Sequence, residues 1–144
     1  MLKMMTILLS FLVVSCQQPD FLDTRGNGYR YEALKDKWLI VNYWATWCGP
    51  CIKEIPELNK LAEEHQENVR VFGVNFDQPL GDEMQAQVAK MKIEFPVYVE
   101  DPSAQLGITR PEVLPTTFVF SPGGELHLTL VGPQTEETLL DSLR

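Results

Sequence analysis

The sequence has few basic residues and no cluster of them. Its 12 lysines and arginines stand against 20 aspartates and glutamates, which gives a formal net charge of −8 at pH 7. Nucleic acids bind proteins through grouped lysine and arginine side chains. The composition therefore excludes nucleic-acid binding through such a surface. Contact with a membrane is expected to come through lipid and not through a polybasic patch.

The sequence also lacks an apolar run long enough to cross a bilayer as a helix. The most apolar segment, residues 4–14, is shorter than the ~20 residues that a spanning helix needs. Lys3 precedes this segment, and no acidic residue occurs before Asp20. A basic start, a short apolar core and a small residue before the cut are typical of secretory signals. We therefore predict a signal peptide over residues 1–15.

Cysteine is scarce, and one of the three cysteines stands apart. Cys16 directly follows the apolar segment, in the tetrapeptide Val13-Val14-Ser15-Cys16. This end resembles a bacterial lipobox, in which a signal peptidase cuts before a cysteine that carries diacylglycerol. The resemblance implies lipidation of Cys16 and a lipidated tether over residues 16–22. An ordinary signal with an incidental cysteine, or an uncleaved anchor, would explain the same residues.

Histidine is scarcer still. The chain has only His65 and His127, and neither has a second candidate ligand at the spacing of known metal sites. We therefore predict no metal site and no cofactor other than a redox-active pair of cysteines.

The rest of the chain has the composition of one globular domain, with 44% apolar and 22% charged residues in a length of 144. Residues 38–44, WLIVNYW, form the almost unbroken apolar run of a strand buried on both faces. Apolar residues then recur at helical spacing from Ile52 to His65. Similar patterns predict strands over 69–76, 116–120 and 125–131, helices over 82–92 and 135–144, and a helical turn over 103–108. Residues 95–99 are expected to form a short strand or an extended piece.

This order of elements predicts the fold class. A strand–helix–strand unit followed by a hairpin and a final helix gives an α/β domain over residues 23–144, with a central mixed β-sheet flanked by helices on both faces. The second arm of the hairpin, ELHLTLV, is expected to alternate between a buried and an exposed face. Thr135 is a candidate N-cap of the last helix. Because Thr138 stands where a capping box has glutamate or glutamine, we expect no full capping box.

Cys48-Gly49-Pro50-Cys51 lies where the buried strand passes into the first helix. The unpaired N–H groups and the dipole at the start of a helix favour a thiolate at Cys48, and the thiolate is the species that attacks disulfides. Cys51, three residues later, lies on the same helical face and can close the pair. Pro50 stiffens this turn, and Gly49 leaves the approach to the first sulfur open. The segment thus offers an exposed attacking sulfur and a sheltered resolving sulfur.

The segment WATWCGPC, followed by KEIPEL and preceded by LIVNYW, resembles the thioredoxin superfamily and in particular its membrane-anchored extracytoplasmic TlpA/ResA-like branch. The resemblance implies a thioredoxin-like fold, with Cys48 as the nucleophile and Cys51 as the resolving thiol. It also implies a cis-proline loop at Leu114-Pro115, packed against the disulfide. The backbone of Leu114 would there offer hydrogen bonds to an extended substrate chain.

Three further residues bear on the chemistry of the cysteine pair: Asn42, Glu54 and Trp47. Asn42 stands where thioredoxins proper keep a buried acidic residue, and Glu54 matches a glutamate of the extracytoplasmic branch. Glu54 is therefore a candidate proton acceptor near Cys51, although a first-turn glutamate that only complements the helix dipole would fit equally well. Trp47 is expected to be a partly exposed platform beside Cys48. The loop GITRPEVLPT (107–116) is a few residues longer than usual, which bears on the choice of partner.

These observations predict a thiol-disulfide oxidoreductase that reduces disulfides of extracytoplasmic proteins. Its partners would be disulfide-bearing proteins and a membrane thiol-disulfide electron donor, and the protein itself would be a monomer. It would be held by lipid on the periplasmic face of a bacterial membrane, either the inner or the outer one. Two other functions stay open: a copper-handling metallochaperone that uses the same thiols, and a thiol peroxidase on a related fold.

Overall fold

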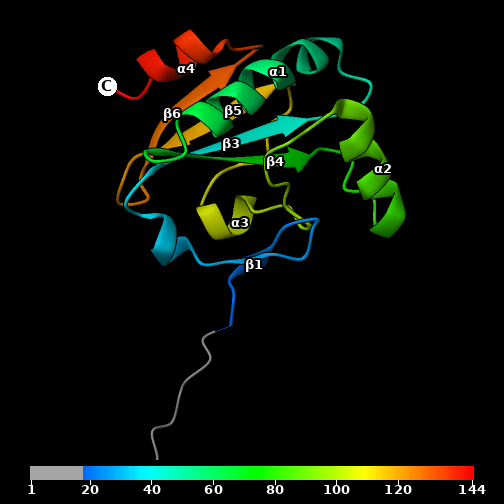
Figure 1. Cartoon of the computed structure of the whole chain (residues 1–144), viewed down its shortest axis with the longest axis horizontal. Helices are drawn as coiled ribbons and strands as arrows, with labels where there is room; N and C mark the ends of the chain where they lie inside the picture. The colour runs from blue at the N-terminus through cyan, green and yellow to red at the C-terminus, as the bar shows by residue number, and fades with distance from the viewer. Residues whose placement is uncertain (1–17) are drawn as a thin grey trace, which may run out of the picture.

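The computed structural model describes residues 18–144, and Figure 1 draws their course from blue to red. The predicted signal peptide over residues 1–15 and the candidate lipidation site Cys16 lie outside the described residues. Between residues 18 and 144, none of the helices combines the length and the apolar character that crossing a membrane would require.

Four strands form the central sheet, in the order β4-β3-β5-β6. The strand β3 is parallel to β4 and antiparallel to β5, and β6 is antiparallel to β5, so the sheet is mixed as predicted. The central position of β3 explains its apolar sequence, because neighbours cover both its edges and both its faces. The strands are β3 (Trp38–Trp44), β4 (Val69–Asn75), β5 (Thr116–Phe120) and β6 (Leu126–Val131).

Residues 95–99 cover the outer edge of β4 without forming a regular strand. The N–H of Gly73 donates to the carbonyl of Pro96 at 2.8 Å, and the N–H of Tyr98 donates to the carbonyl of Gly73 at 2.8 Å. The segment is therefore the short extended piece that its sequence allows. It satisfies part of an edge that would otherwise be open to pairing.

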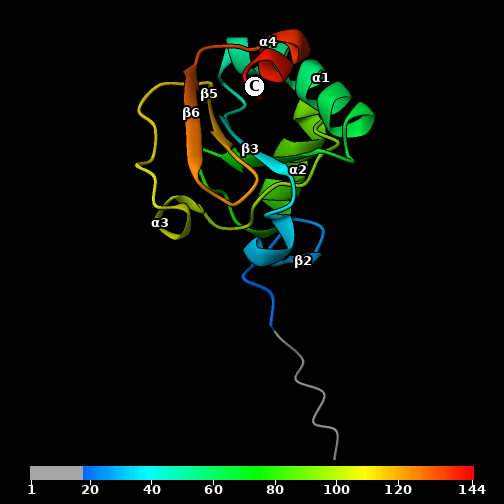
Figure 2. The same cartoon turned by 90° about the vertical axis from the view of Figure 1, so that its left-hand side faces the viewer.

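Helices cover both faces of the sheet (Figures 1 and 2). The helices α1 (Gly49–Glu64) and α4 (Glu136–Asp141) lie on one face, and α2 (Gly81–Met91) contributes buried side chains to the same core. Apolar residues of β3 and α1 form the centre of this core: Ile40, Trp44, Ile55, Leu58 and Leu61. Ile52 was expected to join them but is exposed, because Cys51 and Glu54 take the inward positions of the first turns of α1.

The opposite face is covered by shorter elements. These are the antiparallel pair β1 (Phe21–Leu22) and β2 (Gly28–Tyr29), the 3₁₀ helix η1 (Tyr31–Leu34), and α3 (Ser103–Leu106). Aromatic rings dominate this second core, in which Phe21 packs against Tyr29, Phe72 and Tyr98. Phe21 and Leu22 are thus part of the folded domain and not of a tether that extends to residue 22. The apolar contacts of Phe21 are the physical reason.

The last strand and the last helix differ from their predictions. Apart from the partly buried Leu130, every residue of β6 is exposed, so the expected alternation of buried and exposed side chains is absent. The strand lies at the edge of the sheet (Figure 2), where the six-residue α4 covers little of it. At the start of α4, Thr135 and Thr138 form a reciprocal capping box, because a threonine hydroxyl reaches the N-cap N–H at 2.9 Å. The expectation that no capping box would form was therefore wrong.

Candidate functional site

Cys48 and Cys51 form a disulfide at the junction between β3 and α1. Cys48 has an extended backbone and is the N-cap of α1, and its Sγ accepts a hydrogen bond from the N–H of Cys51 at 3.2 Å. This N–H is one of the donors that the start of a helix leaves unpaired. Together with the helix dipole it favours negative charge on the sulfur of Cys48.

The two residues between the cysteines have the expected roles in the helix start. Pro50 lies in the first turn, where the missing N–H of proline leaves no hydrogen bond unmade. A Cβ at Gly49 would meet no atom within 4 Å, so the space beside this residue is open. The turn is therefore stiff along the chain and unobstructed on its outer side.

The two sulfurs differ in their access to solvent. In the disulfide form Cys48 keeps 5% of its surface exposed, whereas Cys51 is fully buried against Ile55 and the rest of the core. The order of exposure agrees with the prediction, although Cys48 is less open than a fully exposed sulfur would be. Of the two residues, only Cys48 has surface that an incoming group can contact directly.

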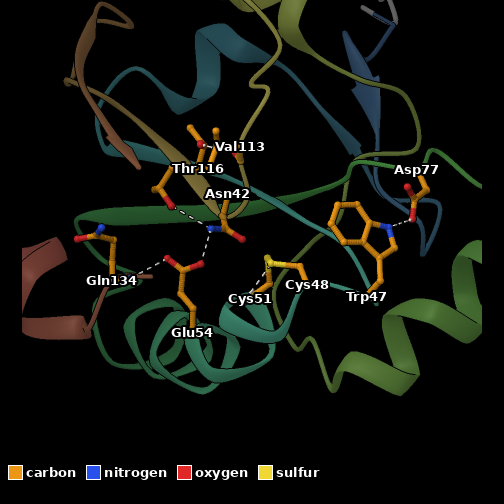
Figure 3. The surroundings of a disulfide bond; sticks show 10 residues. Asn42, Trp47, Cys48, Cys51, Glu54, Asp77, Val113, Thr116 and Gln134 are labelled. Atoms are coloured by element: carbon orange, nitrogen blue, oxygen red, sulfur yellow. Dashed lines mark hydrogen bonds between the residues drawn. A yellow bond between two sulfur atoms is a disulfide. The ribbon is translucent and has the colours of Figure 1, made fainter. Parts of the chain in front are cut away.

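Glu54 is 1% exposed and lies one turn of α1 after Cys51 (Figure 3). Its Oε2 accepts a hydrogen bond from Nδ2 of Asn42 at 2.9 Å, and its Oε1 accepts one from the backbone N–H of Gln134 at 3.0 Å. Nδ2 of Asn42 also donates to Oγ1 of Thr117 at 2.9 Å. The carboxyl group is thus enclosed by uncharged donors from β3, β5 and the segment before α4.

Burial raises the pKa of Glu54 from its ordinary value of 4.5 to about 7, because the charged form loses its hydration. The hydrogen bonds from Gln134, Asn42 and Thr117 act in the opposite direction, since they stabilise the carboxylate. The carboxyl group can therefore take up or release a proton near neutral pH. A glutamate that only complemented the helix dipole would not need to be buried.

Trp47 is 64% exposed and lies beside the disulfide, as expected for a platform (Figure 3). Its indole Nε1 donates to Oδ2 of Asp77 at 2.9 Å, and its ring meets that of Phe76 edge-on at 6.3 Å between centroids. The exposed ring is therefore held in one orientation by the turn that follows β4.

The bond between Leu114 and Pro115 is cis, as the resemblance implies. Leu114 packs against the core cluster that contains Cys48 and Cys51. The carbonyl of Pro115 accepts from the N–H of Gly132 at 2.9 Å, and Oγ1 of Thr116 donates to the carbonyl of Val113 at 2.8 Å. These bonds tie the loop to the β5–β6 hairpin next to the site.

The long loop before Leu114 is anchored by an arginine that the sequence did not single out. The guanidinium of Arg110 lies 4.1 Å from the centroid of the Phe76 ring, and it also bonds the carbonyl of Phe76. Its Nε is 3.3 Å from Oδ2 of Asp101, whose Oδ1 accepts from the hydroxyl of Tyr43 at 2.8 Å. The loop is therefore fixed to the same turn that orients Trp47.

Sequence reasoning also missed Asp77, Thr117 and Gln134. Asp77 lies two residues after the end of the buried strand β4, and a polar residue close to such a strand end is a signal that could have identified it. Thr117 and Gln134 are 75 and 80 residues from their partners Asn42 and Glu54, and no local pattern marks them.

The family is decided by a match that covers most of the chain. The profile of the AhpC/TSA family matches residues 14–129. The chain belongs to the AhpC/TSA family.

Individual relatives of this AhpC/TSA protein indicate which activity within the family it has. The thiol-disulfide oxidoreductase ResA of Geobacillus kaustophilus (strain HTA426) is 30% identical over 132 residues, which cover 89% of this chain and 75% of that protein. ResA of Bacillus subtilis (strain 168) is 32% identical over 129 residues, which cover 85% of this chain and 70% of that protein. A thiol:disulfide interchange protein of Chlorobium tepidum TLS, described as a thioredoxin family protein, has a TM-score of 0.67 at 25% identity over 85% of this chain and 88% of that one.

The relatives and the cysteine pair indicate the same activity. The protein is a thiol-disulfide oxidoreductase with a thioredoxin-like fold, and its redox-active pair is Cys48 and Cys51. The predicted α/β class and the predicted activity are both confirmed.

Proposed function

We propose that this protein reduces disulfides of extracytoplasmic proteins, with Cys48 as the nucleophile. The observation that carries this proposal is the placement of Cys48, which is the only partly accessible sulfur of the pair and accepts the N–H of Cys51 at the start of α1. In the reduced protein its thiolate attacks one sulfur of a substrate disulfide. The substrate bond breaks, a mixed disulfide with Cys48 forms, and the other substrate sulfur leaves as a thiolate.

Cys51 completes the exchange. Its thiol transfers a proton to the carboxylate of Glu54, whose pKa of about 7 suits an acceptor at neutral pH. The resulting thiolate of Cys51 attacks the sulfur of Cys48, the Cys48–Cys51 disulfide forms, and the second substrate sulfur leaves. Two electrons pass from the cysteine pair to the substrate, and a membrane thiol-disulfide donor returns them for the next cycle.

The substrate chain binds beside the disulfide, across the loop that contains Pro115. Leu114 packs against the core cluster that contains the cysteines, and it lies two residues before the start of β5. An extended peptide would add to this backbone as a strand adds to an edge, while the ring of Trp47 covers its side chains. The protein would act as a monomer, since one chain supplies every group named here.

A lipid anchor at Cys16 would keep the protein at the periplasmic face of a bacterial membrane. The lipobox-like end of the apolar segment supports this placement, and the acidic composition offers no polybasic alternative. The anchor would bring the oxidised pair within reach of its membrane electron donor.

Insulin reduction tests the proposal. The full chain should reduce insulin with dithiothreitol as the final donor, and Cys48→Ser should abolish this activity while the fold, followed by circular dichroism, stays intact. Cys51→Ala should instead accumulate mixed disulfides with its substrates, which can be identified in the native host. Retained insulin reduction by Cys48→Ser would refute the assigned nucleophile.

Two further assays address the alternatives. Stoichiometric capture of copper(I) in competition with a chelator, without insulin reduction, would favour a metallochaperone, and consumption of peroxide would favour a peroxidase. Within residues 18–144 the one grouping of three possible metal ligands is Glu64, His65 and Glu136. It lies at the far end of α1 from the cysteines, and Lys60 and His65 already pair with Glu136, so it gives the metallochaperone no support.

A further inference from the structure

Asn42 is buried in the centre of the sheet beside the proposed proton acceptor. It is fully buried on β3, between Ile40 and Trp44 on the face that also holds Cys51. Its Nδ2 makes two hydrogen bonds, to Glu54 and Thr117, whereas its Oδ1 has no protein partner among residues 18–144. A buried amide oxygen without a partner is rare and requires a reason.

The orientation of the amide is compatible with an ionised Glu54. With Nδ2 toward Oε2 of Glu54, a donor meets a carboxylate oxygen; with the amide turned over, two acceptors would meet and repel. The observed orientation therefore suits ionised Glu54. Figure 3 shows the unpartnered Oδ1 on the side of the amide that faces the disulfide.

A proton on Glu54 reverses this preference. The new O–H needs an acceptor, and Nδ2 of Asn42 and the N–H of Gln134, which are bonded to the carboxyl, are both donors. The hydroxyl of Thr117 also contacts Glu54, but its oxygen already accepts from Nδ2 of Asn42. Oδ1 of Asn42 is the unused buried acceptor of the site. Half a turn about the terminal torsion of Asn42, which is a soft and nearly two-fold rotation, brings Oδ1 to Glu54 and Nδ2 to the side of the cysteines.

We propose that the Asn42 amide rotates when Glu54 accepts a proton, and that it thereby turns an N–H donor toward the thiolate of Cys51. Asn42 is then a positioning residue that couples the two ends of the proton transfer. The proposal rests on the proposed roles of Glu54 and Cys51. The proton moves from Cys51 to Glu54, the amide rotates, and the N–H stabilises the sulfur that has lost the proton.

The surroundings of Glu54 leave this coupling undisturbed by other charges. Besides Cys51, the partly buried titratable groups on α1 and α4 are Glu57 and Glu136. The other titratable groups on these two helices are exposed: Lys53, Lys60, Glu63, Glu64, Glu137 and Asp141. Glu57 accepts the N–H of Glu136 at 2.9 Å, and Glu136 pairs with Lys60 at 2.6 Å. On the sheet, the polar groups that contact Glu54 are the uncharged side chains of Asn42 and Thr117.

Nuclear magnetic resonance of the oxidised wild-type protein tests the rotation directly. A pH titration should move the side-chain NH₂ signals of Asn42 with the same midpoint as the carboxyl carbon of Glu54. Above this midpoint the NH₂ protons should show Overhauser contacts to the methyl group of Thr117. Below it they should show contacts to the β-protons of Cys51. Contacts to Thr117 that persist unchanged on both sides of the midpoint would overturn the proposal.

A substitution provides the second test. Asn42→Ala removes both the donor to the carboxylate and the proposed acceptor for the protonated form. Because the hydrogen bond to the charged form is the stronger of the two, the midpoint of Glu54 should still rise, by less than about one pH unit. Asn75→Ala is the matched control: Asn75 is also fully buried in the sheet, but its Nδ2 bonds Gln87. This control should leave the midpoint of Glu54 in place.

The outcomes separate this inference from the proposed function. If the wild-type protein reduces insulin through Cys48 but the contacts of Asn42 do not change with pH, only the rotation is wrong. If insulin reduction fails, the proposed function is wrong whatever Asn42 does. Should Asn42→Ala not fold, the titration of the wild-type protein still decides the matter.

Discussion

The ionisation of Glu54 connects the site to the stability of the whole fold. In the unfolded chain this carboxyl group has a pKa near 4.5, and burial raises the value to about 7 in the folded protein. Below the lower value both states hold the proton. As pH rises toward the upper value, unfolding releases the proton, and the folded state loses stability relative to the unfolded one.

Glu54→Gln should therefore flatten the pH dependence of stability. The difference in the free energy of unfolding between the wild type and Glu54→Gln should change by up to about 3 kcal/mol between pH 4.5 and 8, since one pKa unit corresponds to about 1.4 kcal/mol. The wild type should lose stability relative to the variant as pH rises. Urea denaturation of the oxidised proteins at several pH values measures this. A difference that does not vary with pH would show that the carboxyl group titrates normally.

The bond between Trp47 and Asp77 leads to a second prediction at this scale. Asp77→Ala frees the exposed indole from its one side-chain hydrogen bond, so the ring should become mobile. We expect a fall of a few-fold in insulin reduction and a change of less than about 1 kcal/mol in stability, because the bond is exposed. Steady-state kinetics and the fluorescence anisotropy of the tryptophans check this. Asp82→Ala, which removes the same charge from the first turn of α2, should leave the activity unchanged.

At the scale of elements, α4 holds the segment that completes the site. Its capping box joins Thr135 and Thr138, and the N–H of Gln134, just before the helix, bonds Glu54. The helix has only six residues and could not persist alone, so its caps and its contacts with α1 keep it in place.

Thr138→Ala should cause the start of α4 to fray. The loss of the capping hydroxyl should lower the free energy of unfolding by about 1 kcal/mol. It should also lower the pKa of Glu54 toward 4.5, as fraying of α4 admits water to the carboxyl group. Thermal denaturation and the titration of Glu54 measure the two effects, and Thr138→Ser, which keeps the hydroxyl, is the control. Equal stability of the Ala and Ser variants would contradict this account of the capping box.

At the scale of the whole molecule, the proposed lipid would attach the protein to a membrane without a polybasic patch. The chain is acidic and has no basic cluster, and the helices described between residues 18 and 144 include none suited to spanning a bilayer. The proposed attachment therefore depends on a single side chain, that of Cys16, which precedes the catalytic domain in the sequence.

Cys16→Ser should move the protein from the membrane fraction to the soluble fraction of its bacterial host. Insulin reduction by the purified variant should equal that of the wild type, because Cys48 and Cys51 are untouched. Fractionation followed by mass spectrometry of the N-terminus measures both the location and the lipid. A variant that stays in the membrane fraction would show that another segment anchors the protein.

Much of the fold and the centre of the site could be predicted from the sequence. The strand from Trp38 to Trp44 and the helix that contains the cysteine pair agree with their predictions. The cis bond before Pro115 was implied by the family resemblance and is also observed. The exposed β6 and the capping box at Thr135 do not. The exposure of β6 depends on what lies beside the strand, which a local pattern does not contain. The capping box is local, and it was missed because the hydroxyl of Thr138 replaces the glutamate or glutamine of the usual motif.

The sequence by itself determined the features that depend on near neighbours: the strand, the helix start that caps Cys48, and the reach of Cys51 one turn later. Hydrophobic periodicity and the unpaired N–H groups of a helix start act over a few residues, so they can be read along the chain. Only the tertiary structure decided that Glu54 is buried and contacted by Asn42, Thr117 and Gln134. Its partners Asn42 and Gln134 lie 12 and 80 residues away, and burial, which raises its pKa, exists only once the sheet and α4 enclose it.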